Sequence, residues 1–263
     1  MLLKTLIPFL EEYKKETKIH FARGGNRPED ALNEFLMGDF KSWQEHQGNP
    51  NFGRQYILSL IRLGNMEWLY GGIYKVNSCK LTRDGTYQYN TALTKFGEEY
   101  IGRAIIYYRR QFRQSYCCLE RYIDELNVIE VKRERYEIPF PGYEWVHLSW
   151  DELSLVIDTD PWKTALMNQK GIYLITDSSN GKKYVGSATG NDMLWGRWKS
   201  YINNGHGGNK ELKSLSFNHI KNYFSYSILD IYKASTDDAL ILEREQWWKD
   251  VLNSRGKYGY NRN

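Results

Sequence analysis

The chain has 263 residues, of which 41% are hydrophobic and 26% are charged, and its formal net charge is +4. This composition is globular, and the length suits two modest domains that each bury a core of their own. No apolar run approaches the roughly 18 residues that a membrane span needs, so we expect no membrane association. The three cysteines, Cys79, Cys117 and Cys118, form no CxxC pair. That pattern argues against a disulfide framework or a zinc site, and it favours a cytoplasmic location.

The positive charge is concentrated in the second half of the chain. Residues 160–263 contain 15 lysines and arginines against ten acidic residues, whereas the preceding part holds 21 basic and 22 acidic residues. A basic half of this kind suits an anionic partner such as nucleic acid. The aromatic content of 15% favours either stacking surfaces or large cores.

The first half is predicted to begin with helices and continue with strands. We expect a helix over residues 2–17, a turn at 23–27, and a second helix that Pro28 opens and Gly38 interrupts. From residue 51 to about 136, short runs rich in β-branched and aromatic residues alternate with breakers such as Asp-Gly. Several short antiparallel strands behind leading helices predict a small barrel or a strongly bent sheet.

A domain boundary is predicted near residue 158. Ser149 is placed to cap a closing helix over 150–157, and the segment 158–161, which ends at a proline, is the best candidate for a linker. We therefore expect two domains, residues 1–158 and 159–263, and an α+β fold.

The stretch around which the second domain is organised runs from Gly171-Ile172-Tyr173 to Tyr184-Val185-Gly186. Two apolar runs flank Asn180-Gly181, and Asn-Gly between such runs is the strongest short-range signal of a hairpin. A helix is expected next at 193–203, then a glycine-rich loop at 204–209, a short helix at 212–215, a strand at 224–231 and a long final helix at 236–252. This order predicts a small three-stranded sheet flanked by helices.

A more literal copy of the same letters occurs in the first half, as Gly72-Ile73-Tyr74 and Tyr100-Ile101-Gly102. Its two tyrosines stand 26 positions apart, against 11 for Tyr173 and Tyr184. The intervening residues carry a strand signal of their own, and a strand rather than an arginine-bearing helix is expected after it. We therefore assign no site to this copy.

The elements after the downstream hairpin add groups that phosphodiester cleavage requires. Arg197 lies on the helix after the hairpin, with Tyr201 one turn later on the same face. Glu245 lies on the final helix, and Asn261 ends the segment Gly259-Tyr260-Asn261. With the hairpin, these residues make the chain from Gly171 to Asn261 resemble the GIY-YIG nuclease family. The tail LEREQWWKDVLNSRGKYGYN is similar to that of phage intron-homing endonucleases.

The resemblance implies a GIY-YIG fold and a role for each matched residue. Tyr173 matches the general base, Tyr184 the tyrosine that orients the attacking water or the phosphate, and Arg197 the arginine that neutralises the scissile phosphate. Tyr201 matches a position that is often histidine in restriction members, and Asn261 matches the polar residue that closes the site. A phenol is a poor base at neutral pH unless cations lower its pKa, which Lys182 or Lys183 would help Arg197 to do.

Glu245 matches the glutamate that binds one divalent metal, Mg²⁺ or another cation such as Mn²⁺. One carboxylate is sufficient because Mg²⁺ also takes phosphate oxygens and waters as ligands. Glu243 competes for this role, but Glu245 stands four residues before Lys249 and is preferred. His206, in the glycine-rich loop, either contacts a phosphate or is merely exposed.

The first half interleaves aromatic and basic residues, and Arg103 and Arg109 are its candidate DNA contacts. A tyrosine-rich β core with solvated arginines is the alternative, and a barrel that binds modified bases is an analogy only. The expected function is that of a metal-dependent endonuclease acting on double-stranded DNA, in restriction or phage defence of a prokaryotic or phage-infected cell, with or without a requirement for modified bases. A homing or mobile-element endonuclease and an inactive nucleic-acid-binding protein are the alternatives. Double-strand cutting from one site per chain leaves a homodimer open.

Overall fold

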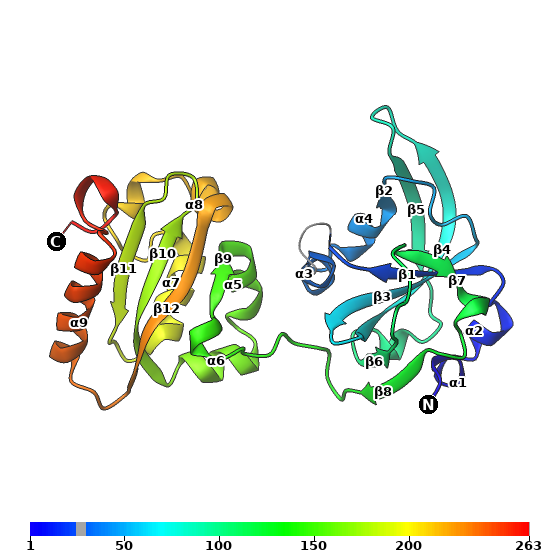
Figure 1. Cartoon of the computed structure of the whole chain (residues 1–263), viewed down its shortest axis with the longest axis horizontal. Coiled ribbons are helices and arrows are strands. Elements are labelled where there is room, and N and C mark those ends of the chain that lie inside the picture. Colours follow the sequence, from blue (N-terminus) through cyan, green and yellow to red (C-terminus); the bar gives the residue numbers. More distant parts are fainter. Residues whose placement is uncertain (25–29, 263) are drawn as a thin grey trace. The chain divides into compact units, whose positions relative to one another are not determined.

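The computed structural model describes residues 1–24 and 30–262, and the chain forms two compact units, Met1–Tyr136 and Glu137–Asn263 (Figure 1). Each unit has a sheet and a hydrophobic core of its own. Within the described ranges, no helix is both long and apolar enough to cross a membrane. The α+β class predicted from the sequence is confirmed.

The first unit contains short helices and a sheet of eight strands. Its elements are α1 (Leu3–Leu6), α2 (Phe9–Glu12), β1 (Thr17–Ala22), α3 (Asp30–Met37), α4 (Phe40–Glu45), β2 (His46–Gln47), β3 (Tyr56–Gly64), β4 (Glu67–Leu81), β5 (Tyr87–Leu93), η1 (Glu98–Tyr100), β6 (Ala104–Tyr107), β7 (Tyr116–Cys118), η2 (Leu119–Arg121) and β8 (Asn127–Val131), where η marks a 3-10 turn.

The long strand β4 bends the sheet of the first unit. Its beginning pairs with β6 and its remainder with β5, while β3 lies along its other side. The bend falls at Gly72, whose φ of +110° is open to glycine but strained for other residues. The sheet runs in the order β2-β5-β4-β3-β1-β7, with β6 paired to β4 and β8 paired to β6, and this curvature confirms the predicted bent sheet.

The helix predicted over residues 2–17 is wrong. The chain forms two short helices separated at Pro8, which lacks the N–H that a continuous helix would use. Thr17 then begins β1, which is parallel to β3 on one side and antiparallel to β7 on the other. Pairing on both sides of a buried strand outweighs the local helical pattern. The turn predicted at 23–27 and Pro28 lie almost entirely outside the described residues.

The upstream copy of the motif letters forms no hairpin. Gly72 and Tyr74 lie within β4, Tyr100 lies in η1, and β6 follows as expected. Ile101 packs on Gly72, where an added Cβ would lie 3.1 Å from the Ile101 Cδ1 atom. These residues therefore shape the core of the first unit.

The second unit contains a four-stranded sheet. Its elements are η3 (Tyr143–Trp145), β9 (His147–Ser149), α5 (Trp150–Val156), α6 (Asp160–Leu166), β10 (Gln169–Asp177), β11 (Lys183–Ala188), α7 (Met193–Asn204), η4 (Leu212–Ser214), α8 (Phe217–Tyr223), β12 (Phe224–Lys233), α9 (Asp238–Val251) and η5 (Gly256–Tyr258). The strand order is β11-β10-β12-β9, and every pair is antiparallel. The three predicted strands are thus joined by a fourth, β9.

Helices cover both faces of this sheet. Tyr173 and Tyr226 point to the face covered by α7, where they pack with the fully buried Trp198. Ile172 and Val185 point to the other face, where Ile241 of α9 covers them. Successive residues of a strand point to opposite faces, so β10 and β11 contribute to both layers.

Residues 137–158 belong to the second unit, so the observed boundary differs from the predicted one at 158. Strand β9 pairs with β12, and Trp150 and Leu153 of α5 pack into the core of the second unit. The predicted cap is confirmed, because Ser149 and Glu152 form a reciprocal capping box at the start of α5. The predicted linker at 158–161 is wrong, since α6 begins there with Pro161 in its first turn.

The buried carboxylate of Asp177 holds the end of the β10–β11 hairpin. It accepts hydrogen bonds from the backbone N–H of Ser179 at 3.0 Å and from His219 Nε2 at 2.7 Å. The hydroxyl of Tyr260 donates to it at 2.5 Å. Burial alone would raise the pKa of Asp177, but the bonds from Ser179, Tyr260 and His219 outweigh it and lower the pKa to about 2.

We expect Asp177→Asn to destabilise the second unit by about 2 kcal/mol at pH 7, because a shift of one pKa unit is worth about 1.4 kcal/mol. The depressed pKa means that this stability is present above pH 4 and is lost as the pH falls toward 2. Calorimetric unfolding at pH 7 and at pH 3 measures both effects, and the variant should lack the acid-dependent part.

Asp84 provides the matched control, because its pKa is also lowered to about 2 by Thr82 and Thr86 but it lies in an exposed turn. Asp84→Asn should change the unfolding free energy far less. Equal effects of the two substitutions would contradict the structural role given to Asp177.

Candidate active site

The predicted hairpin is present as β10 and β11, and its register fixes where the two motif tyrosines lie. Tyr173 stands opposite Gly186, and Tyr184 stands opposite Ile175. Both tyrosines point to the face covered by α7, and their ring centroids are 6.3 Å apart. The connection spans 178–182, with Gly181 at a φ of +74°.

Gly186 leaves open the space that the Tyr173 hydroxyl occupies. A Cβ at Gly186 would lie 2.4 Å from the Tyr173 Oη atom and 2.6 Å from its Cζ atom. No side chain larger than glycine fits there unless the phenol moves. The group that approaches this glycine closely is therefore the Tyr173 phenol.

Three side chains form a hydrogen-bonded group beneath helix α7. Arg197 Nε donates to the Tyr173 hydroxyl at 2.8 Å, and the hydroxyls of Tyr173 and Tyr201 are 2.9 Å apart. Tyr173 and Tyr201 have no exposed surface, whereas Arg197 is partly exposed. The guanidinium of Arg197 thus lies between the buried phenols and the surface.

Burial dominates the acidity of both phenols. It raises the pKa of Tyr173, and nearby Tyr184 adds to this, while Arg197 and the hydrogen bond from Tyr201 act in the opposite direction. Burial also raises the pKa of Tyr201 well above its ordinary value. Tyr173 is therefore neutral at pH 7, and its hydrogen-bond partners Arg197 and Tyr201 are the groups that make its deprotonation easier.

Tyr184 differs from its partner, because within the described ranges its hydroxyl forms no hydrogen bond with another side chain. Its side chain is 8% exposed. A hydroxyl with a free donor and acceptor can bind a water or a phosphate oxygen.

A second bond fixes Arg197 to the glycine-rich loop. Its Nη1 atom donates to the carbonyl of Gly207 at 2.7 Å. Gly207 has a φ of +53° and lies so close to the Tyr201 ring that a Cβ would be 2.5 Å from it. His206 is half-buried beside this contact, and its Nδ1 accepts from the N–H of Gly208 at 2.9 Å. The second ring nitrogen of His206 is the one left to donate.

Glu245 approaches strand β11 from the opposite face of the sheet. It is 8% exposed, and its carboxylate accepts a hydrogen bond from the hydroxyl of Ser187. Lys249, one turn later on α9, pairs with its other oxygen at 2.6 Å. Glu243 is exposed, so the geometry favours Glu245 over Glu243 as a metal ligand.

A pocket of about 380 Å³ lies between the end of β11 and the first turns of α7, and its described lining does not include Tyr173, Tyr184 or Glu245. Ser187 lines it, and so does Arg197, which means that the partner of Glu245 and the partner of Tyr173 face the same space. Asp192 also lines this pocket, and Arg197 forms no ion pair with it among the residues that the structure describes. The arrangement can hold an anion at Arg197 with a cation close to the Ser187 side.

Asn261 acts on the backbone of β11. Its Oδ1 atom accepts from the Val185 N–H at 2.9 Å and from the Ser254 hydroxyl at 2.8 Å, and its Nδ2 atom donates to the Val185 carbonyl at 2.8 Å. Gly259 permits this chain path, because a Cβ there would lie 1.9 Å from the carbonyl oxygen of Ser254. Asn261 therefore secures the edge strand and has no free polar atom directed at the pocket.

The remaining residues that were predicted to contact DNA do not belong to the described lining of this pocket. Lys182 lies over the ring of Tyr260 at 5.4 Å, and Lys183 begins β11, so both are near the turn and neither lines the pocket. Arg103 is engaged by the carbonyls of Lys132 and Glu99 in the first unit. Arg109 is exposed and lines a different pocket, in the first unit.

Ser187 was missed from the sequence, although strand alternation contained the signal. It lies three residues after Tyr184 and therefore points to the opposite face, toward the helix that carries Glu245. The Gly207 carbonyl was missed because a backbone contact leaves no side-chain signature.

Residues 169–261 match the family model of the GIY-YIG catalytic domain, so this part of the chain belongs to the GIY-YIG family. Intron-associated endonuclease 1 of Enterobacteria phage T4 is 39% identical over 93 residues, which are 35% of this chain and 36% of that protein. The chain thus spans about a third of the length of this curated relative.

Two solved structures are similar over the same region. The catalytic domain of the homing endonuclease I-TevI is 37% identical and is matched over 98% of its length and 36% of this chain, with a TM-score of 0.29. A glutamate-to-alanine mutant of the I-TevI catalytic domain is 36% identical, with 92% and 35% covered and a TM-score of 0.28.

We expect Gly186→Ala to destabilise the second unit by about 1–3 kcal/mol, the usual cost of overpacking a core. The added methyl group occupies the position of the Tyr173 hydroxyl and forces that ring away from Arg197. Urea unfolding measures the change. Gly190→Ala is the control, because a Cβ there meets nothing within 4 Å. A Gly186→Ala protein as stable as the Gly190→Ala protein would contradict the packing described here.

Proposed function

We propose that this protein is a metal-dependent DNA endonuclease whose second unit hydrolyses phosphodiester bonds. The observation that carries the proposal is the pocket that is lined both by Arg197 and by Ser187, the hydrogen-bond partner of Glu245. A scissile phosphate needs positive charge on its oxygens as the transition state forms. Membership of residues 169–261 in the GIY-YIG family supports the same chemistry.

In this proposal Arg197 binds the scissile phosphate. Among the residues that the structure describes, its guanidinium has a phenol and a carbonyl as partners but no carboxylate, so its full charge is available to an anion. Movement of Arg197 toward the phosphate would also release its hydrogen bond to the buried Tyr173 hydroxyl. Tyr173 would then reach the attacking water as general base, and the free hydroxyl of Tyr184 would orient it.

The residues present fit one divalent cation. Within the described ranges no three metal-binding side chains of the His, Cys, Asp or Glu type come together, so a site at Glu245 would take its other ligands from the phosphate and from water, as Mg²⁺ commonly does. Such a cation would stabilise negative charge on the phosphate oxygens. Ser187 and Lys249 hold the Glu245 carboxylate in the orientation that this role needs.

The first unit is proposed to recognise DNA and the chain as a whole to act in restriction or phage defence. A homing or mobile-element role is the second candidate, and it is favoured by the likeness to the intron-associated endonuclease of phage T4 and to a homing endonuclease catalytic domain. Sequencing the ends released from modified and unmodified phage DNA separates the two roles. Cuts at many sites support defence, and a cut at one rare site supports homing.

We expect Glu245→Gln to reduce plasmid cleavage in Mg²⁺ by at least about 100-fold, because the amide cannot replace the charge that a divalent cation needs. Mn²⁺ should restore activity to the wild-type protein after chelation but not to the variant. Conversion of supercoiled DNA to nicked and linear forms measures the rates.

Glu243→Gln is the control on the same helix, since Glu243 is exposed while Glu245 is buried against Ser187. It should cleave at close to the wild-type rate. Loss of activity in Glu243→Gln with activity retained in Glu245→Gln would overturn the metal assignment, and cleavage by neither wild-type protein nor variants would overturn the proposed activity.

We expect Tyr201→Phe to slow cleavage about tenfold at pH 7, the effect of losing one hydrogen bond. The Tyr201 hydroxyl stabilises the deprotonated form of Tyr173 by donating to it. Its removal raises the pKa of Tyr173, so the rising limb of the pH–rate profile should move to higher pH by about one unit.

Tyr226→Phe is the matched control, because the Tyr226 hydroxyl is buried without a hydrogen-bond partner and its ring packs 6.0 Å from that of Tyr201. Its pH–rate profile should match that of the wild-type protein. If Tyr201→Phe lowers the rate without moving the profile, the hydrogen bond has no part in activating Tyr173.

A further inference from the structure

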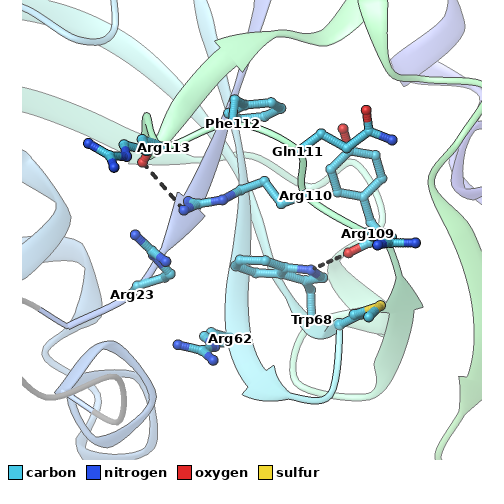
Figure 2. A pocket seen from close by; sticks show the side chains of 10 residues that line it. Arg23, Arg62, Trp68, Arg109, Arg110, Gln111, Phe112 and Arg113 are labelled. Carbon is cyan, nitrogen blue, oxygen red and sulfur yellow. Dashed lines mark hydrogen bonds between the residues drawn. The ribbon is translucent and has the colours of Figure 1, made fainter.

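The first unit contains a pocket of about 470 Å³ that is rich in arginine (Figure 2). Arg23 follows β1, Arg62 lies in β3, and the others belong to the segment between β6 and β7. The five arginines that line it are Arg23, Arg62, Arg109, Arg110 and Arg113. Segments far apart in the chain therefore converge to form one concentration of positive charge.

Among residues 1–24 and 30–262, no acidic side chain lines this pocket and none of its five arginines forms an ion pair. Some arginines elsewhere in the first unit are neutralised by a carboxylate. Arg54, for example, forms a bidentate pair with Glu120 at 2.6 Å and 2.8 Å. The charge of the pocket is thus available to a ligand.

Arg110 occupies the middle of the arginine group. Its guanidinium donates to the carbonyls of Gln114 and Arg113 at 3.2 Å and 3.3 Å, which holds it in place without neutralising it. Burial lowers the pKa of Arg110, and the neighbouring charges of Arg23 and Arg62 lower it further. Figure 2 shows Arg23, Arg110 and Arg113 on the same side of Trp68. A bound anion would relieve this repulsion.

Aromatic side chains form the support of the pocket. Trp68 and Tyr108 are 4% and 3% exposed, and the Trp68 Nε1 donates to the Tyr108 carbonyl at 3.1 Å. Phe112 is half-buried, and the Arg110 guanidinium lies 5.7 Å from its ring centroid. Because Trp68 and Tyr108 are buried in the core, they offer little surface for stacking on a base. The chemistry that the pocket presents to a ligand is that of its guanidinium groups.

We infer that this pocket binds the phosphate backbone of DNA and so positions the substrate independently of base sequence. Guanidinium groups match phosphate oxygens in shape and charge, and contacts of this kind fix the register of a protein on DNA without reading bases. The inference rests on the proposed function for its choice of DNA as the polyanion. It extends to the other four arginines of the pocket the role of DNA contact that was predicted for Arg109.

The test is DNA binding by the full chain in EDTA, so that no cleavage is needed. Fluorescence anisotropy with a short labelled duplex gives the affinity over a salt series. The double variant Arg62→Gln/Arg113→Gln should bind about tenfold more weakly, and the slope of log K against log salt should fall by about one to two, since each lost phosphate contact removes about 0.9. The loss should be equal on duplexes of unrelated sequence.

The control is Arg83→Gln/Arg133→Gln, which removes the same charge from two exposed positions of the same unit. It should bind within twofold of the wild-type protein, and calorimetry should give all three proteins the same unfolding temperature. Equal weakening in both double variants reduces the effect to net charge and overturns the inference. A loss confined to one duplex sequence also overturns it, because base readout would then be the cause.

Titration with inorganic phosphate and with dAMP distinguishes the source of the phosphate. Either one should compete with the duplex only at millimolar concentration. Micromolar binding of dAMP that the pocket variant abolishes would assign the pocket to a free nucleotide and overturn the inference. The protein could bind DNA through this pocket and yet never cleave it in Mg²⁺. That result would support the inference and overturn the proposed nuclease activity, so the two failures are distinguishable.

Discussion

Strand β11 carries both halves of the candidate site, and its position depends on the two hydrogen bonds between the carboxamide of Asn261 and the backbone of Val185. As the edge strand of its sheet, β11 has backbone groups that no neighbouring strand satisfies. The carboxamide of Asn261 supplies the donor and the acceptor that a neighbouring strand would supply. Tyr184 then faces α7 and Ser187 faces α9. A shift of β11 by one residue would turn its side chains to the opposite faces of the sheet.

The two faces of β11 have complementary electrostatics. On one face, Arg197 contacts phenols that burial keeps neutral, so its charge is uncompensated. On the other face, Glu245 is already paired with Lys249. A divalent cation near Glu245 must therefore share the carboxylate with an amine, which weakens binding until phosphate oxygens complete the ligand set. In the proposed function, a single carboxylate would therefore be sufficient for a cation that binds together with the substrate phosphate.

The sequence predicted the hairpin, α5, α7, β12 and α9 of the second unit because each has a local signal, whereas β9, α6 and α8 were missed. Asn180-Gly181 marks the hairpin, and Ser149 and Glu152 mark the start of α5. Predictions failed where distant pairing decides. The strand at 17–22 exists because β3 and β7 lie on either side of it. The residues that resemble catalytic ones were found by their order in the chain, whereas no local pattern could reveal that Arg23 and Arg62 share a pocket.

The arginines of this protein differ in whether their hydrogen-bond partners neutralise their charge. Arg54 and Arg244 bind carboxylates, which neutralise their charge within the fold. Arg197 and Arg110 are held by phenol and carbonyl oxygens, which leave their charge intact. A guanidinium that is held in place without an acidic partner is already partly desolvated before an anion binds. It therefore loses little further rotamer freedom on binding. The same principle therefore accounts for a candidate phosphate site in each unit.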